Sequence, residues 1–567
     1  MADEACREKI ISQDFWDFII PFYRRDVEII LSENEACIED AGFGYRILHV
    51  DKNVAGDVTI ETYGYNGIPN CYALLDIGAM NQAGISALQN YPTLQLQGEG
   101  IMIGFLDTGI DYTNTIFRNL DGGTRIAAIW DQTIQTGTAP EGFSYGSEYT
   151  EMQINAALRS TNPENIVPSR DNNGHGTFLA SIAAGNADIE NRFQGAAPKA
   201  TLGIVRLKEA KNFLKDFYAI RENAICYQEN DIMMGLKYLH ELALRRRMPL
   251  VICVALGSNF GGHNGSSILS MVLRDYAELE NRCVVIGAGN EANERHHFQG
   301  KLEKQESAKE VEIRVENPGR GFVAELWTTL PNIVTAYVTS PSGEKSPLIS
   351  IRQGSRYDLN FPFDATKVTV EYRLLMANND SQLIFFRFEN PAQGIWKIGV
   401  NPLQITDGEF HIWLSIKEFQ DNQAYFLEAN PDITLTEPGS TEGAMTVSYY
   451  NGTENSVYFN SVRGYTRSNL VNPDFAAPGV QVTGLSNNGR FVKRSGSSIA
   501  AGITAGASAL IMEWLRKQPE VRGVTTSQVT NIILFGVNQG TLPEYPNREW
   551  GYGTLDVYQS LDRLRRL

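Results

Sequence analysis

The stretch IMIGFLDTGID, residues 101–111, decides how the chain folds. It opens with a continuous apolar run, and the run ends at Asp107, which Thr-Gly follows. A continuous apolar run of strand length is typical of a parallel sheet that is buried on both faces. Because ligands of such sheets bind at the carboxyl ends of the strands, the sequence predicts that Asp107 stands at a functional edge.

Three more apolar runs of strand length follow, and helix-length segments separate them. The runs cover residues 201–207, 249–256 and 283–289. Periodic apolar residues predict helices over 175–185, 231–247, 266–280 and 495–518. Alternation of strands and helices predicts an α/β fold with a doubly wound parallel sheet.

Between residues 301 and 432 the helical pattern stops, and short strand-like segments with turn signals between them take its place. The candidates are VEIRVE, FVAELWTTL, IVTAYVTS, KVTVEYRLL, LIFFRFE, GIWKIGV and FHIWLSI. This spacing suits a β-sandwich or jelly roll. Because the α/β pattern returns afterwards, we expect 301–432 to be a β domain inserted between two parts of the α/β domain, 77–300 and 433–567.

The N-terminal residues predict a small α+β unit of their own. Strand-like segments occur at 27–31, 45–50, 58–63 and 71–76, and EACIEDAG (35–42) could supply a helix that ends at Gly42. We place the end of this unit at residue 76, with 97 as the farthest alternative.

The composition limits the possible partners. The 567 residues are too many for one hydrophobic core, since single domains rarely exceed about 300 residues. A net charge of −17 argues against nucleic acid and against an anionic membrane as partners. The acidic N-terminus lacks the basic and apolar stretches of a signal peptide, so we expect synthesis in the cytoplasm.

The cysteines and acidic residues do not indicate a metal or another cofactor. The six cysteines are Cys6, Cys37, Cys71, Cys226, Cys253 and Cys283. No CxxC pair occurs among them, and we expect buried, reduced thiols rather than a structural metal. Glu222, Glu229 and Asp231 could bind calcium, but we assign no metal to them.

Two further motifs carry residues that complete a catalytic set with Asp107. His175 lies in NNGHGT, directly before a predicted helix, and Ser498 lies in SGSSIAAG at the start of another. A serine hydroxyl becomes a nucleophile when an imidazole takes its proton, and a carboxylate holds that imidazole in the correct tautomer. Asn290 in GAGN is a candidate donor to a developing oxyanion, beside the backbone N–H of Ser498.

These motifs resemble those of the subtilisin-like serine peptidases (S8 family), in which the catalytic residues follow the order Asp, His, Ser. The resemblance covers GFLDTGID (104–111), NGHGTFLASIAAG (173–185), ALGSNFGG (255–262), GAGN (287–290), PDFAAPG (473–479) and GSSIAAG (496–502). The chain departs from the family's usual nucleophile motif at Ser497, Ile499 and Gly502, where Thr, Met and Pro are common. No departure removes a catalytic group, and alignment on Gly496 selects Ser498 rather than Ser497.

The family resemblance implies roles for further residues. Leu256 and Gly257 would pair with the substrate backbone, and Gly287, Ala288 and Gly289 would border the pocket for the residue before the cleaved bond. The N-terminal unit would be a prodomain that the enzyme removes by cutting within 70–79, with 91–97 as the alternative.

The β insertion, with GFLDTGIDYTN (104–114) and RIAAIWDQT (125–133), resembles the Csp germination proteases of clostridial spores. That resemblance implies a spore-associated enzyme whose substrate is a cortex-lytic pro-enzyme. An alternative stays open: a pseudoprotease, or a binding or signalling protein, whose prodomain never leaves.

Overall fold

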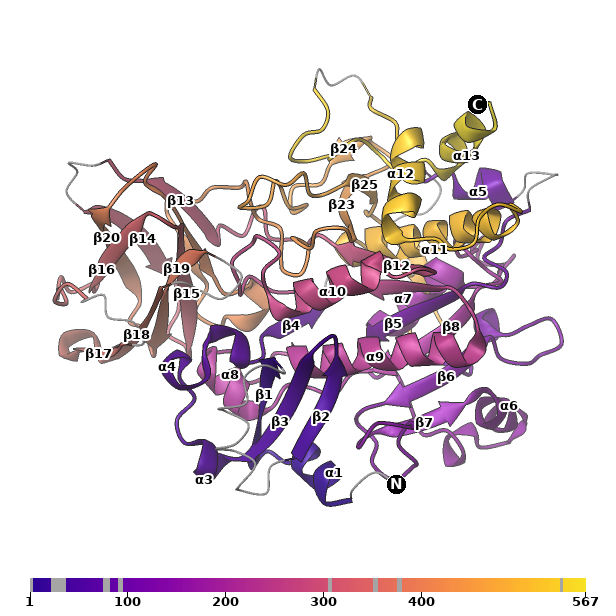
Figure 1. The fold of residues 1–567 in the computed structure, drawn as a ribbon, viewed down its shortest axis with the longest axis horizontal. Coiled ribbons are helices and arrows are strands. Elements are labelled where there is room, and N and C mark those ends of the chain that lie inside the picture. The colour runs from indigo at the N-terminus through magenta and orange to yellow at the C-terminus, as the bar shows by residue number, and fades with distance from the viewer. Residues whose placement is uncertain are drawn as a thin grey trace.

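A nine-stranded sheet forms the centre of the protein, and helices cover both of its faces (Figure 1). The structure is a computed structural model that describes residues 4–21, 37–74, 82–89, 95–303, 308–349, 355–374, 380–540 and 544–566. The strands of the sheet are β5 (Met102–Asp107), β6 (Ile126–Asp131), β7 (Ser147–Thr150), β8 (Thr201–Arg206), β10 (Leu250–Val254), β12 (Arg282–Gly287), β23 (Met445–Asn451), β24 (Ser456–Val457) and β25 (Phe475–Pro478).

The strand order is β24-β23-β12-β10-β5-β8-β6-β7, with β25 beside β23. Neighbours are parallel except that β7 runs antiparallel to β6 and β24 runs antiparallel to β23. The four predicted apolar runs are confirmed as β5, β8, β10 and β12, side by side at the centre. Ile103 and Phe105 enter one core and Met102 and Leu106 the other, so both faces are buried.

Helices pack on each face of this sheet. Those of the first core are α7 (His175–Ala184), α11 (Ser497–Arg516), α12 (Thr526–Gly536) and α13 (Val557–Arg565), and those of the second are α9 (Glu229–Arg246) and α10 (Ile268–Glu278). Shorter helices are α5 (Ile85–Gln89), α6 (Glu151–Arg159) and α8 (Asn212–Phe217). The four helices predicted from the sequence are confirmed as α7, α9, α10 and α11.

The long helix α11 is apolar enough, by length and composition, to cross a membrane. It lies instead inside the protein, with 94% of its most apolar window buried. Its neighbours are α7 and the strands β10, β12 and β23. A helix that is apolar all round is expected in the core of a large domain, so the packing accounts for its composition.

Two antiparallel sheets share a core at one end of the molecule (Figure 1). One contains β13 (His297–Lys301), β21 (Glu409–Leu414), β15 (Gly321–Thr329), β19 (Ser381–Glu389), β18 (Thr366–Leu374) and β17 (Arg356–Phe361), in that order. The other contains β16 (Ile333–Thr339), β20 (Gly394–Gln404), β14 (Lys309–Val315) and β22 (Ala424–Phe426). Each of the seven predicted strands matches one of these, and β13 begins before the boundary expected at residue 301.

The N-terminal residues form a separate three-stranded antiparallel sheet that packs against α9 (Figure 1). Its elements are α1 (Glu4–Ile11), β1 (Phe15–Pro21), β2 (Cys37–Gly42), β3 (Tyr45–Asp51), α3 (Lys52–Ala55) and α4 (Ile60–Tyr63). The predicted strand at 45–50 is confirmed as β3. The strand predicted at 27–31 lies outside the described residues.

Two sequence predictions for this unit are wrong. Residues 37–42 form the strand β2 rather than a helix, because alternate residues are buried where the segment pairs with β3. Within 58–63 the structure has the helix α4 instead of a strand. Thr59 caps this helix, and the Glu371 side chain of β18 accepts hydrogen bonds from the N–H groups of Ile60 and Glu61. A contact with a distant strand thus overrides the local β propensity.

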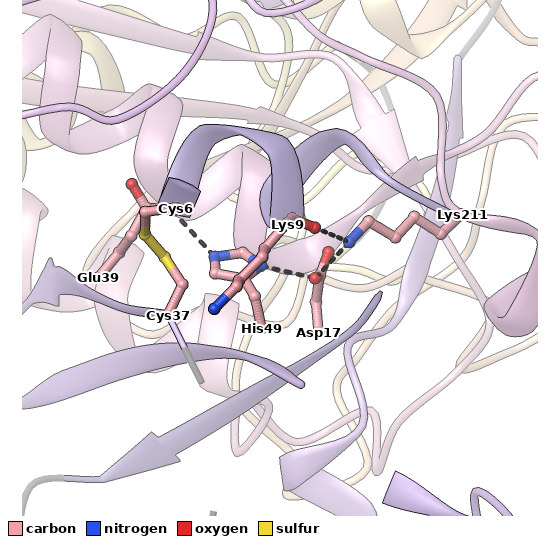
Figure 2. The surroundings of a disulfide bond; sticks show 7 residues. All are labelled: Cys6, Lys9, Asp17, Cys37, Glu39, His49 and Lys211. Atoms are coloured by element: carbon pink, nitrogen blue, oxygen red, sulfur yellow. Dashed lines mark hydrogen bonds and ion pairs between the residues drawn. A yellow bond between two sulfur atoms is a disulfide. The ribbon is translucent and has the colours of Figure 1, made fainter. Parts of the chain in front are cut away.

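The prediction that all six cysteines are reduced is also wrong, because Cys6 and Cys37 form a disulfide (Figure 2). It links α1 to β2 and closes a loop of 31 residues, the kind of closure that stabilises a small unit by restricting its unfolded state. The other four cysteines are free and buried.

A buried polar cluster beside the disulfide joins the N-terminal sheet to the rest of the protein (Figure 2). Asp17 accepts hydrogen bonds from Lys211 Nζ at 2.6 Å and, on its other oxygen, from Gln228 Nε2 at 2.5 Å. His49 Nδ1 lies 2.6 Å from Asp17, and its Nε2 lies 3.1 Å from Glu39. Burial disfavours a charged imidazole, but Asp17 and Glu39 outweigh it and raise the pKa of His49. Opposite charges therefore face each other across this buried contact.

Candidate active site

Asp107 lies at the carboxyl end of β5, where the apolar run stops. Its side chain is 1% exposed, so its oxygens depend on protein donors. Thr108 supplies its backbone N–H at 2.7 Å to Oδ1, and its hydroxyl oxygen lies 3.1 Å from the same oxygen. The carboxylate is thereby fixed in one orientation at the sheet edge.

His175 is the first residue of α7 and faces Asp107. Gly174 before it has φ of 88°, a left-handed conformation that glycine adopts without strain. Gly176 after it is required by space, since a Cβ there would meet the carbonyl oxygen of Gly109 at 2.2 Å. His175 Nδ1 lies 2.8 Å from Asp107 Oδ2 and 2.9 Å from Oδ1. The carboxylate therefore favours the tautomer that carries its proton on Nδ1.

Ser498 is the second residue of α11 and is fully buried. Its Oγ lies 3.2 Å from His175 Nε2, within the reach of a proton transfer. The structure thus brings Asp107, His175 and Ser498 into one hydrogen-bonded line, although 323 residues separate His175 from Ser498.

Asn290 lies beside the first turn of α11. Its Oδ1 accepts a hydrogen bond from the N–H of Ser497 at 3.1 Å. That bond fixes the carboxamide beside the first turn of α11, which carries Ser498. The arrangement suits a developing oxyanion, which needs donors fixed in place before the reaction.

Asp171 is a member of the site that the sequence analysis did not identify. Its Oδ1 accepts hydrogen bonds from the Thr108 hydroxyl at 2.7 Å and from the Gly174 N–H at 2.7 Å. Its Oδ2 accepts from the N–H and hydroxyl of Thr177, at 2.8 and 2.7 Å. Asp171 therefore caps α7 and joins it to the loop after Asp107. Asp171 lies three residues before Gly174, the residue directly preceding α7, so it is not at the usual capping position and the local pattern does not mark it.

The predicted substrate-binding residues Leu256 and Gly257 form the short strand β11 (Leu256–Gly257), and this strand is already paired. Its partner is β4 (Cys71–Leu74), which confirms part of the strand expected at 71–76; Leu74 lies opposite Leu256 and Ala73 opposite Gly257. On its other side β4 pairs with β9 (Tyr227–Gln228). A segment of the N-terminal unit thus occupies the middle of a three-stranded antiparallel sheet, the geometry of a bound peptide strand.

Gly287, Ala288 and Gly289 lead from the end of β12 to Asn290. The Ala288 N–H donates to Val447 and its carbonyl accepts from Thr436 at 2.9 Å, so the turn is held on both sides. Gly289 has φ of 115°, and a Cβ there would meet the Thr436 hydroxyl at 2.5 Å. These contacts fix the path of the backbone into Asn290.

Comparisons with known proteins agree with this geometry. The model of the subtilase family matches residues 98–320 and 421–553. A solved structure of the CspB protease of Clostridium perfringens has a TM-score of 0.75 and 29% sequence identity, over 86% of this chain and 97% of that one.

Curated relatives match over shorter parts of their own length. The C5a peptidase of Streptococcus pyogenes serotype M18 is 22% identical over 75% of this chain and 36% of the relative. A subtilisin-like protease of Arabidopsis thaliana is 30% identical over 22% of this chain and 17% of the relative. The chain therefore spans about a third or less of the length of the curated relatives it matches.

Proposed function

The chain belongs to the subtilase family of serine peptidases, and on that premise we propose that it is an endopeptidase that cleaves proteins through an acyl-enzyme. One observation carries the proposal: His175 lies 3.2 Å from Ser498 Oγ on one side and 2.8 Å from Asp107 on the other. This arrangement is the one that converts a serine hydroxyl into a nucleophile.

The reaction uses each of these groups in turn. Ser498 Oγ attacks the carbonyl carbon of the peptide bond while His175 Nε2 takes the hydroxyl proton, and Asp107 stabilises the resulting imidazolium. The negative charge that develops on the carbonyl oxygen is met by the Asn290 carboxamide and the Ser498 N–H. His175 then protonates the leaving amine, and a water molecule hydrolyses the acyl-enzyme by the same steps.

A direct experiment compares wild type with Ser498→Ala on an unfolded protein substrate. We expect fragments from the wild type alone, and covalent labelling of Ser498 by a fluorophosphonate, which reacts with activated serines. Equal cleavage by both proteins would remove Ser498 from the mechanism.

We further propose that the enzyme removes its own N-terminal unit as a prodomain. The support is β4, which pairs with β11 as a peptide substrate would. This pairing favours a cut within 70–79, of which residues 70–74 are described, over the window 91–97, whose first residues lie outside the described part of the chain. N-terminal sequencing of the purified protein would locate the cut, and Ser498→Ala should remain one chain.

The physiological substrate that we propose is a cortex-lytic pro-enzyme of bacterial spores. The support is the likeness to the CspB protease over nearly its whole length, with the jelly-roll insertion that we assign to the two antiparallel sheets. We propose cytoplasmic synthesis followed by association with the spore, and the net charge of −17 argues against nucleic acid or an anionic membrane as partners. Incubating the purified protein with such a pro-enzyme, and with the Ser498→Ala variant beside it, tests the proposal.

Two observations favour a second candidate function, that of a binding or signalling protein with a retained prodomain. The buried pair of Asp17 and Lys211 and the pairing of β4 both hold the N-terminal unit on the cleft. If the unit stays after cleavage, added peptides would not be hydrolysed although autoprocessing had occurred. That combination of results would separate this function from the endopeptidase.

A further inference from the structure

A polar subsite lies where the N-terminal segment enters the cleft. We propose that Glu229 and Tyr218 form a specificity subsite that selects substrates with Asn and Tyr two residues apart, upstream of the cleaved bond. The proposal rests on the proposed function, and it takes the segment that contains Asn70 and Tyr72 as the first substrate of the enzyme.

Tyr72 and Asn70 are enclosed by the protein, as the residues of a bound peptide would be. Tyr72 lies in β4 opposite Tyr227, two residues before the Leu74 that pairs with Leu256. Tyr72 is 0% exposed and Asn70 is 4% exposed. Because β4 is the middle strand of its sheet, both residues belong to the part of the segment that a trans substrate would have to replace.

Glu229, the first residue of α9, makes contact with both positions. Its Oε2 accepts the N–H of Asn70 at 3.1 Å, and its own N–H donates to the Asn70 carbonyl at 2.9 Å. Its Oε1 accepts the hydroxyl of Tyr72 at 3.4 Å. Glu229 therefore binds both the backbone at Asn70 and the side chain of Tyr72.

A different residue, Tyr218, binds the side chain of Asn70. Tyr218, which is fully buried, donates its hydroxyl to Asn70 Oδ1 at 3.0 Å. A hydrocarbon side chain at this position would leave that hydroxyl without its partner in an enclosed site, which is unfavourable. Tyr218 thus distinguishes Asn from apolar residues of similar size.

Glu229 is fixed from the opposite side as well. The N–H of Leu269 in α10 donates to Oε1 at 2.9 Å, so the carboxyl group is positioned before any substrate enters. Burial raises the pKa of Glu229 to about 7, against the effect of the hydrogen bonds it accepts. Burial also raises the pKa of Tyr72 well above its usual value, which keeps its hydroxyl protonated as a donor.

A subsite that hydrogen-bonds a substrate group discriminates against the analogue that lacks it, because its own buried polar atoms lose a partner. We expect a preference of roughly 10-fold for Tyr over Phe and for Asn over Leu, since a single hydrogen bond contributes about one factor of ten. Glu229 carries two acceptor oxygens for three donors. A Gln at this position has one, so Glu229→Gln cannot serve all three.

The decisive experiment measures kcat/KM on the processed enzyme with peptides that reproduce residues 68–79. The peptides carry Tyr or Phe at the position of Tyr72, and Asn or Leu at that of Asn70. We expect the wild type to prefer Tyr and Asn, Glu229→Gln to lose the Tyr preference, and Tyr218→Phe to lose the Asn preference. Equal kcat/KM for all peptides with the wild type would overturn the proposal.

Tyr238→Phe is the matched control variant, because Tyr238 stays in the processed enzyme. It also removes a buried tyrosine hydroxyl, the one that donates to Glu148 at 2.9 Å, and this hydroxyl does not contact the paired strand in the contacts described. We expect this variant to keep both preferences. Loss of the preferences in Tyr238→Phe would show that they depend on general packing rather than on the subsite.

A second measurement does not require catalytic activity, so it tests the subsite even if the purified protein is inactive. Cys71 is a buried free thiol in β4, so its alkylation rate, followed by peptide mass spectrometry, reports how often the segment leaves the cleft. In full-length Ser498→Ala we expect Tyr72→Phe to raise this rate roughly 10-fold. An unchanged rate would refute the subsite, whereas cleavage of no peptide by the wild type would refute the proposed function.

Discussion

Thr108 donates its hydroxyl to Asp171 at 2.7 Å, a bond that joins the residue after Asp107 to the loop leading into His175. The same carboxylate caps α7 through the N–H groups of Gly174 and Thr177. Asp171 is therefore a positioning residue. It fixes the two elements that carry Asp107 and His175.

The first prediction follows from this contact. Asp171→Asn keeps the size of the side chain but turns an amide N–H₂ toward donors that need acceptors. We expect kcat to fall roughly 10- to 100-fold with little change in KM, because small displacements of catalytic groups have effects of this size. Asp188→Asn is the control, since Asp188 accepts a hydrogen bond only from Asn191 in an exposed turn among the contacts described. Equal kcat for the two variants would argue against the positioning role.

The second prediction concerns the reacting groups. Ser498→Ala or His175→Ala should lower kcat by about 10⁶, and the double variant should lose little more, because the two act as one unit. Asn290→Ala should lower kcat by about 10² to 10³ and leave KM nearly unchanged, since its carboxamide serves the transition state. A KM effect of Asn290→Ala as large as its kcat effect would place Asn290 in ground-state binding instead.

The sequence predicted the central sheet and the three reacting residues because each depends on local pattern. The apolar run that ends at Asp107 predicts a buried strand, and the glycines around His175 predict a turn before a helix. Each of these signals lies within a few residues. Ser498 likewise follows a glycine and precedes an apolar helix. Parallel strands then bring these ends together, as their shared sheet edge requires.

The errors occurred where distant residues decide the local structure. The segment 58–63 has strand-like composition, but Glu371, 311 residues away from Ile60, accepts hydrogen bonds from the first N–H groups of a helix there. The disulfide partner of Cys37 is Cys6, which lies 31 residues away along the chain, and no local sequence pattern connects the two. The cluster of Asp17 and Lys211 likewise joins positions 194 residues apart.

The third prediction concerns the attachment of the N-terminal unit. Lys211→Met removes one of the two buried cationic groups that face Asp17, and His49 remains at 2.6 Å, so we expect the loss to cost less than the roughly 3–5 kcal/mol of a fully unpaired buried charge. We expect the cleaved N-terminal fragment to separate from the rest of the protein to a larger extent with Lys211→Met than with the wild type, as the free fraction measured by size-exclusion chromatography. Lys52→Met is the control, since Lys52 pairs with Asp14 at the surface and such pairs contribute little. An equal free fraction of the fragment for Lys211→Met and the wild type would show that the pair does not hold the unit.

The last prediction is a pH dependence of stability. Glu325 of β15 is fully buried and accepts hydrogen bonds from the hydroxyl of Tyr65 and the N–H of Gly261. Burial raises its pKa to about 7 from the ordinary value of 4.5. Between these values the unfolded chain has lost the proton that the folded protein keeps. Stability therefore falls as pH rises through this window and levels off above about pH 7.

Glu325→Gln removes this titration. We measure the free energy of unfolding in urea from pH 5 to pH 8. Over this range we expect it to decrease by about 2 kcal/mol less for Glu325→Gln than for the wild type. Part of the slope will remain, because burial raises other carboxyl pKa values to about 7, namely those of Glu229, Glu418, Glu437 and Asp474. Glu310→Gln should keep the wild-type slope, since Lys397 lowers the pKa of Glu310 and moves its titration below the window. Parallel profiles for wild type and Glu325→Gln would mean that Glu325 is already ionised in the folded protein at pH 5.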